Sequence, residues 1–311
     1  TLYAAPFYGE SSMIMYRTDL MEKAGLEMPD APTWDFIRQA AAAMTDRDAE
    51  INGVCLRGKA GWGEGGAFIT AMSNSFGARW FDMDWKPQFD TAAWANTLNF
   101  YKGMMDESGP AGYATNGFNE NLSLFQQGKC GMWIDATVAA SFVTNPNDST
   151  VADSVGFALA PDNGLGKRSN WLWAWAMAIP AGSPNAEAAS DFIEWATSKD
   201  YVQAVGNHPE FGWGSVPTGQ RASTYAIPEF QAAAAFAAAE LAAIESAAPE
   251  ATAIKPYVGV QFAAIPEFPE VGSAVAQEMA AALSGAKSVE DALAAAQKAA
   301  DSIMKEAGYY D

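Results

Sequence analysis

The stretch that decides the fold runs from Asn119 to Asp135 and reads N-E-N-L-S-L-F-Q-Q-G-K-C-G-M-W-I-D. Its first half predicts a short helix that ends at Gly128. The apolar run from Cys130 to Ile134 predicts a buried strand, which leaves Asp135 at the carboxyl end of that strand. A helix that leads directly into a buried strand is typical of α/β proteins.

The same alternation of helices and strands extends along the rest of the chain. Thr33 is a candidate N-cap for a helix that ends near Met44, and a buried strand follows at 52–56. The run 171–179 predicts a long strand that ends before Pro180. Further helices are expected at 92–105, 184–197, 230–247 and 271–283, with a last one between Ser288 and Gly308. The sequence therefore predicts the α/β fold class.

The composition excludes several classes of function. Among the 311 residues, 37 are acidic and 18 are basic, so the formal net charge is −19. A surface of this charge repels nucleic-acid phosphates and anionic lipid headgroups, but it is compatible with an uncharged ligand. No apolar run approaches the roughly 20 residues that a membrane-spanning helix needs, so we expect no membrane insertion.

Residues that hold metals or act as catalytic bases are scarce. The chain has one histidine, His208, and two cysteines, Cys55 and Cys130. We therefore expect no metal site, no cofactor and no enzymatic activity. Both cysteines lie in strand-like segments, so they either form a disulfide, if the protein is exported, or remain two separate thiols.

Two patterns resemble known motifs but fail on their spacing. The glycines of 61–66 match G-x-G-x-x-G, yet three residues separate them from the preceding strand, so a dinucleotide site is not expected. The run 46–57 has the acidic spacing of a calcium loop. It carries Ile51 and Arg57 where a glycine and a glutamate are required, and we interpret it as a polar turn.

Eleven tryptophans are more than a hydrophobic core usually requires. The surplus favours a binding site in which the flat apolar faces of the rings contact a ligand. Trp171, Trp173 and Trp175 alternate, so they share one face of a strand. They form either a core stripe or part of a cleft wall, for which Trp173 is the candidate contact. Trp62 and Trp213, in glycine-rich loops, are further aromatic candidates.

Polar side chains near strand ends are candidates to bind a hydroxyl-rich ligand, because carboxylates accept hydrogen bonds from neighbouring hydroxyls. Glu10 follows a strand and is either a ligand contact or a solvated turn residue. Asp135 lies where open α/β sheets bind ligands and is either a contact or a cap. Glu64 is a third acidic candidate. Arg221 either donates to hydroxyls or pairs with a carboxylate. The amide candidates are Asn119 and Gln261.

Several segments resemble family 1 of the extracellular solute-binding proteins of ABC transporters. They are Pro6 to Ser12, Met15 to Leu20, Ala24 to Leu26, Pro32 to Trp34, Leu124 to Trp133, Ala178 to Pro180, Ser183 to Asn185, and Gly285 with Ser288 to Ala292. Within the family, the chain is most similar to the sorbitol- and mannitol-binding proteins. That likeness rests on Gly61 to Glu64, Gly117 to Asn121, Trp133 to Thr137, Trp171 to Trp175, and Val216-Pro217 with Arg221.

The resemblance implies a periplasmic-binding-protein-like fold of type II, with two lobes and the ligand in the cleft between them. It also implies that the N-lobe is incomplete in this chain and that Ser11 joins Glu10 among the ligand contacts. The implied division is 1–7 as a crossover strand from the N-lobe, 8–172 as the C-lobe, 173–245 as an N-lobe portion, and 246–311 as the C-lobe return with the C-terminal helices.

The function that the resemblance implies is binding of a small polyol or sugar, such as mannitol or sorbitol, for an ABC importer. The expected partners are that ligand and the permease subunits, and the protein is expected to be a monomer. The resemblance also implies an exported, periplasmic protein. The chain shows no initiator Met and no signal peptide, so we expect either that its true start has been removed or that it is a fragment.

Two alternatives to polyol binding remain open at this point. One is an oligosaccharide-binding protein of the same fold, whose longer ligand would stack on several tryptophans. The other is a glycoside hydrolase that uses two of the acids Glu10, Glu64 and Asp135 as a catalytic pair. Turnover of a glycoside would indicate the hydrolase, whereas binding of maltose but not of hexitols would indicate the oligosaccharide-binding protein.

Overall fold

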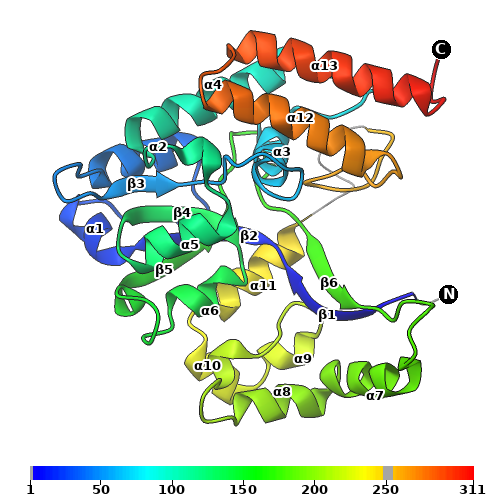
Figure 1. The fold of residues 1–311 in the computed structure, drawn as a ribbon. Coiled ribbons are helices and arrows are strands. Elements are labelled where there is room, and N and C mark those ends of the chain that lie inside the picture. The colour runs from blue at the N-terminus through cyan, green and yellow to red at the C-terminus, as the bar shows by residue number, and fades with distance from the viewer. Residues whose placement is uncertain (1–2, 248–254) are drawn as a thin grey trace.

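The computed structural model describes residues 3–247 and 255–311, in which helices alternate with short strands (Figure 1). The strands are β1 (Ala5–Glu10), β2 (Ser12–Arg17), β3 (Asn52–Cys55), β4 (Cys130–Ala136), β5 (Val155–Leu159) and β6 (Trp173–Met177). The predicted α/β class is confirmed. The predicted strands at 52–56, 130–134 and 171–179 appear as β3, β4 and β6.

The helices keep most of the predicted bounds and caps. They are α1 (Thr18–Lys23), α2 (Trp34–Met44), α3 (Gly65–Ser75), α4 (Ala92–Ser108), α5 (Phe118–Gln126), α6 (Ala139–Val143), α7 (Ala186–Ala196), α8 (Lys199–Gly206), α9 (Ala222–Tyr225), α10 (Pro228–Ala233), α11 (Ala237–Ser246), α12 (Phe268–Leu283) and α13 (Val289–Glu306). Thr33 Oγ1 accepts from the Phe36 amide at 3.3 Å, and Ser288 Oγ accepts from the Asp291 amide at 3.0 Å. Both predicted N-caps are therefore confirmed.

The single helix predicted at 230–247 is wrong, because the chain breaks between α10 and α11. On one continuous helix, Phe230 and Phe236 would point about 120° apart. The break lets both side chains enter the same buried cluster, where their ring centroids lie 6.3 Å apart. Tertiary packing thus overrides the helix propensity of an alanine-rich stretch.

The strands form two sheets that share one continuous segment of chain. Four strands have the order β3-β4-β2-β5, with β3 parallel to β4 and with β2 antiparallel to both of its neighbours. The other sheet is an antiparallel ribbon of β1 and β6, in which Tyr8 lies opposite Trp175 and Glu10 opposite Trp173. Since only Ser11 separates β1 from β2, Glu10 lies at the junction of the two sheets.

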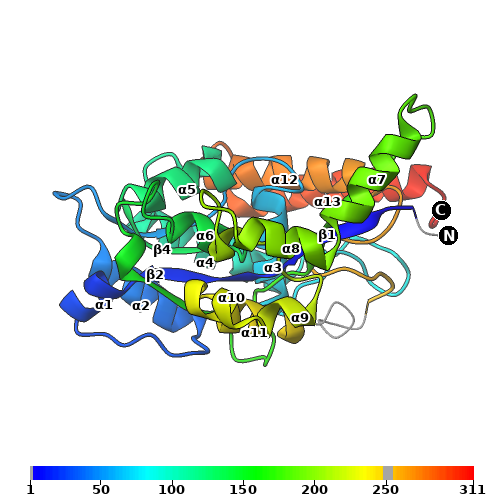
Figure 2. The ribbon, with the colours of Figure 1, turned by 90° about the horizontal axis from the view of Figure 1, so that it is seen from below.

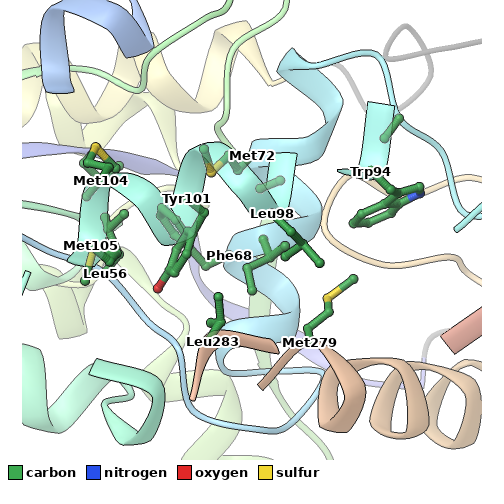
Figure 3. Packing of buried hydrophobic residues seen from close by; sticks show 14 of the residues in the cluster. Leu56, Phe68, Met72, Trp94, Leu98, Tyr101, Met104, Met105, Met279 and Leu283 are labelled. Carbon is green, nitrogen blue, oxygen red and sulfur yellow. The ribbon is translucent and has the colours of Figure 1, made fainter. Parts of the chain in front are cut away.

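Helix α3 is the centre of the main core. All of its residues are buried, and its side chains Phe68 and Met72 pack with Leu98 and Tyr101 of α4 and with Met279 of α12 (Figure 3). This fixes the N-terminus of α3, where Glu64 is the N-cap residue. The packing therefore sets the position of the glycine-rich loop that precedes α3.

Helices α7 to α10 lie on the other side of the β1–β6 ribbon from α12 and α13 (Figure 1). Phe230 and Val202 from these helices share a buried cluster with Met13 of β2. Helix α7 projects from the rest of the molecule (Figure 2), and its Phe192 and Trp195 are exposed. The lobe boundaries given above are not tested by these contacts and stay a prediction.

The two cysteines form a disulfide between β3 and β4. Cys55 and Cys130 are both buried, and their Cα atoms lie 6.0 Å apart. The bond settles the alternative that the sequence left open. In residues 3–247 and 255–311, no helix combines the length and apolar character needed to cross a membrane, and no group of metal-binding side chains is found.

Candidate functional site

A cavity of about 650 Å³ lies where the ribbon, the start of α3 and the start of α5 meet. Seven of its sixteen lining residues are aromatic, with acidic and basic groups among the rings. The lining residues are Tyr8, Glu10, Arg57, Trp62, Gly63, Glu64, Ala67, Phe118, Asn119, Ala136, Val138, Phe142, Trp171, Trp173, Trp175 and Gln261. This volume lies in the range of small-molecule sites, roughly 300–1,000 Å³.

The ribbon supplies one aromatic wall of the cavity. Trp173 and Trp175 lie on β6 and Trp171 just precedes it, so all three alternating tryptophans line the cavity. Tyr8 of β1 stacks on Trp175 with ring centroids 6.1 Å apart and planes at 27°. Trp62 meets Trp173 edge to face at 6.1 Å. The wall thus offers ring faces and edges to the apolar C–H groups of a ligand.

Arg57 is held between two rings at the base of the cavity. Its Cζ atom lies 5.2 Å from the centroid of Phe118 and 5.5 Å from that of Trp171. Its Nε and Nη2 donate to the two carboxylate oxygens of Asp135 at 2.8 and 2.5 Å, and Nη1 donates to the Gly63 carbonyl at 3.1 Å. These contacts fix the guanidinium plane and leave a second N–H on each terminal nitrogen.

Asp135 lies behind the cavity wall rather than in it. Its side chain has no exposed area, and its oxygens also accept from Trp133 Nε1 at 3.0 Å and from the Ala136 amide at 2.7 Å. With Arg57 bound as well, these four bonds occupy the carboxylate. Asp135 therefore orients Arg57. It does not line the cavity, in contrast to the direct ligand contact that was predicted for it.

Glu10 lines the cavity although only 7% of its surface is exposed. Burial raises the pKa of Glu10 from 4.5 to about 7, and the negative charge of Asp135 adds to this rise. The Arg57 charge and the indole N–H groups of Trp175 and Trp171 shift the pKa in the opposite direction. The carboxyl group therefore changes its charge near neutral pH.

Glu64 is held at the mouth of the cavity by two neighbours. Its Oε2 accepts from the Phe118 amide at 3.3 Å and lies 3.6 Å from Arg57 Nη1. Gly117 leaves room for this carboxylate, because a Cβ atom at that position would lie 2.5 Å from Oε2 and would displace it. Glu64 keeps acceptor capacity for a hydroxyl group.

Of the ten residues predicted as ligand contacts, six line the cavity. They are Glu10, Trp62, Glu64, Asn119, Trp173 and Gln261. The amide of Gln261 is already used: its Oε1 accepts from the Leu172 amide at 3.4 Å, and its Nε2 donates to the Leu172 carbonyl at 3.1 Å. Gln261 therefore supports the start of β6, and Asn119 is the exposed amide of the pair.

The other four predicted residues do not line the cavity. Asp135 is described above. Ser11 is fully buried, and its Oγ donates to the Trp171 carbonyl at 2.6 Å. Trp213 packs among α8–α11 residues, where its ring fills the space left by Gly206. Arg221 donates from Nη2 to the Thr197 carbonyl at 2.5 Å, so neither role proposed for it is the one observed.

Sequence reasoning missed Tyr8, Arg57 and Phe118. Tyr8 was detectable, because it alternates with Glu10 on one strand and so shares its face. Arg57 follows β3 closely, and β3 pairs with β4 in parallel, so both carboxyl ends meet at one edge. The sequence did not reveal that pairing.

Comparison with known proteins gives the family. The model of the bacterial extracellular solute-binding protein family matches residues 1–203. The chain belongs to this family. A mannitol-binding protein of Pseudomonas aeruginosa is 48% identical over 311 residues, which cover 99% of this chain and 71% of that protein.

Two solved structures of solute-binding proteins are also similar. One from Agrobacterium vitis S4, with bound D-mannitol, has 62% identity and a TM-score of 0.96, covering 100% of this chain and 74% of that chain. One from Agrobacterium radiobacter K84, in complex with ribitol, has 27% identity and a TM-score of 0.83, covering 96% and 71%. These likenesses confirm the predicted solute-binding fold and a binding role without enzymatic activity.

Proposed function

We propose that this solute-binding protein captures an acyclic polyol, with mannitol and sorbitol as first candidates, and delivers it to an ABC importer. The observation that carries the proposal is the 62% identity, over the whole chain, to a solute-binding protein with bound D-mannitol. The P. aeruginosa relative named for mannitol binding supports it independently.

The cavity chemistry supports an uncharged, hydroxyl-rich ligand. Glu10 and Glu64 accept hydrogen bonds from hydroxyl groups, and the remaining N–H groups of Arg57 donate to hydroxyl oxygens. The rings of Trp62, Trp173 and Trp175 cover the C–H edges of the carbon chain. An acyclic hexitol presents both kinds of group along its length, so each part of the cavity has a matching part of the ligand.

We further propose that binding is coupled to closure of two lobes about the β1–β6 ribbon, with the lobe division 1–7, 8–172, 173–245 and 246–311 given above. Hinge closure is a common motion of periplasmic binding proteins. The ligand favours the closed form only through contacts that it makes differently in the two states. Glu10 and Trp173 lie both in the ribbon and in the cavity lining, so their contacts with the ligand are suited to change when the lobes close. The permease subunits, a periplasmic location and a monomeric state belong to the same proposal.

Isothermal titration calorimetry with mannitol, sorbitol, ribitol and maltose tests the proposed function. A dissociation constant in the micromolar range for a hexitol, with no heat from maltose, is the expected result; it corresponds to about −8 kcal/mol. Binding of maltose alone would replace the polyol with an oligosaccharide. Release of free sugar from a glycoside would overturn the binding role altogether.

A further inference from the structure

The charges around the cavity do not balance. Glu10, Glu64 and Asp135 carry three negative charges when ionised, and Arg57 is the one positive charge among the lining residues. The guanidinium is committed to Asp135 by two hydrogen bonds. Arg57 also lies 3.6 Å from Glu64. Among the described residues, no ion pair to Glu10 is formed, so Glu10 is the acid of this group that has no direct ion-pair partner.

An uncompensated carboxylate at this depth is costly. Only 7% of Glu10 is exposed, and removing an ionised group from water is unfavourable unless a partner replaces the lost solvation. Aromatic side chains line the cavity with it: Tyr8, Trp171 and Trp175. Rings of this kind attract cations to their faces. A ligand cation would thus meet both a carboxylate and ring faces at the same place.

We propose that the cavity accepts amino polyols, hexitol-length chains in which one hydroxyl is replaced by a primary ammonium, with the ammonium against Glu10. This inference rests on the proposed function, because the remaining hydroxyl groups of the amino polyol are assigned to the same contacts that bind a neutral polyol. It extends the ligand class from neutral polyols to hydroxylated cations. By the same charge argument, a sugar acid of equal length is excluded.

The experiment is calorimetry at pH 8 with three ligands that differ only at carbon 1. They are sorbitol, 1-amino-1-deoxysorbitol and gluconate, which are neutral, cationic and anionic. A primary ammonium has a pKa of about 10 and stays charged at this pH. The same comparison is made with mannitol and 1-amino-1-deoxymannitol. Mannitol differs from sorbitol in the stereochemistry of one hydroxyl group, so a poor fit of that hydroxyl in one pair does not decide the result.

The amino polyol of at least one pair is expected to bind about fivefold or more tightly than its neutral counterpart, and gluconate is expected to give no heat. Glu10→Gln keeps the shape of the side chain and removes its charge, so the preference for the amine should disappear. The matched control is Glu229→Gln, which makes the same charge change at an exposed position on α10 and should leave the preference intact.

Two results overturn the inference: amino polyols that in both pairs bind no more tightly than the neutral hexitol, or a preference that survives Glu10→Gln. The neutral hexitols report on the proposed function separately. If they bind and the amines do not, the proposed function stands and the inference fails. If only the amines bind, the inference stands and neutral polyol transport fails.

Discussion

Arg57, which lines the cavity, forms a two-point ion pair with Asp135 directly behind it, with N–O distances of 2.8 and 2.5 Å and no exposed area on the Asp135 side chain. The pair joins β4 to the loop after β3 and holds the guanidinium between Phe118 and Trp171. The cavity residue is therefore Arg57, and Asp135 positions it.

Asp135→Ala should cause a loss of both stability and affinity. Removing one partner of a buried pair leaves the other charge uncompensated, which costs about 3–5 kcal/mol of unfolding free energy. Hexitol affinity should fall as well, because Arg57 loses its orientation. Urea unfolding and calorimetry measure the two effects. The exposed pair Arg38–Glu107 is the control, and Glu107→Gln should change little. Unchanged stability of Asp135→Ala would contradict the positioning role.

Hexitol binding should strengthen as pH rises from 6 to 8. The pKa of Glu10 is raised to about 7 in the free protein, and hydroxyl donors stabilise its ionised form, so binding lowers that pKa and releases a proton. If only the carboxylate binds well, affinity at pH 6 is about tenfold below its plateau above pH 8. Calorimetry in buffers of different ionisation heat measures the released proton. Glu10→Gln should bind with no pH dependence over this range; a slope equal to the wild type would exclude Glu10 as the titrating group.

Local patterns made most elements predictable. Thr33 and Ser288 predict the starts of their helices, because an N-cap hydrogen bond depends only on residues within three positions. Glu10, Trp62, Glu64 and Trp173 were found as candidates because each combines a suitable side chain with a strand end, a strand face or a glycine-rich loop. These signals are short-range, and a single sequence contains them.

The remaining site residues depend on contacts between distant segments. Arg57 and Asp135 are 78 positions apart, and their meeting follows from the parallel pairing of β3 with β4. Trp213 and Arg221 lie in segments between longer helices, and the sequence of such segments does not predict which way a side chain points. The Trp213 ring contacts Gly206, and Arg221 donates to the Thr197 carbonyl, so neither side chain faces the cavity. Strand pairing and loop direction were the missing information.

Glu240 on α11 should make the unliganded protein less stable as pH rises from 4.5 to 7. Burial raises its pKa from 4.5 to about 7, while the hydrogen bond from Thr218 and the nearby hydroxyl groups of Tyr225 and Thr137 act against that rise. Because the folded state holds this proton more tightly than the unfolded state, the contribution of Glu240 to stability is greatest below pH 4.5. That contribution falls through the window by on the order of 3 kcal/mol.

The isosteric change Glu240→Gln isolates that contribution. The variant cannot ionise, so its unfolding free energy relative to the wild type should increase between pH 5 and pH 8, as measured by urea unfolding at both values. Thr218 Oγ1 donates to Glu240 Oε1 at 2.6 Å, and the glutamine oxygen can keep this bond. An equal difference between variant and wild type at the two pH values would show that Glu240 does not titrate in this range.

Trp175→Ala should weaken hexitol binding with little loss of stability. The side chain is 50% exposed, so its truncation leaves no large void, but its ring lines the cavity and stacks on Tyr8. Loss of a ring that covers part of the ligand is expected to cost about 1–1.5 kcal/mol, which is roughly tenfold in the dissociation constant. Trp195→Ala on α7 is the matched control, because that ring is 48% exposed, also packs on a tyrosine, Tyr201, and does not line the cavity. Equal affinity losses in the two variants would mean that the effect arises from general disturbance of the fold, and the ribbon would then not be a binding wall.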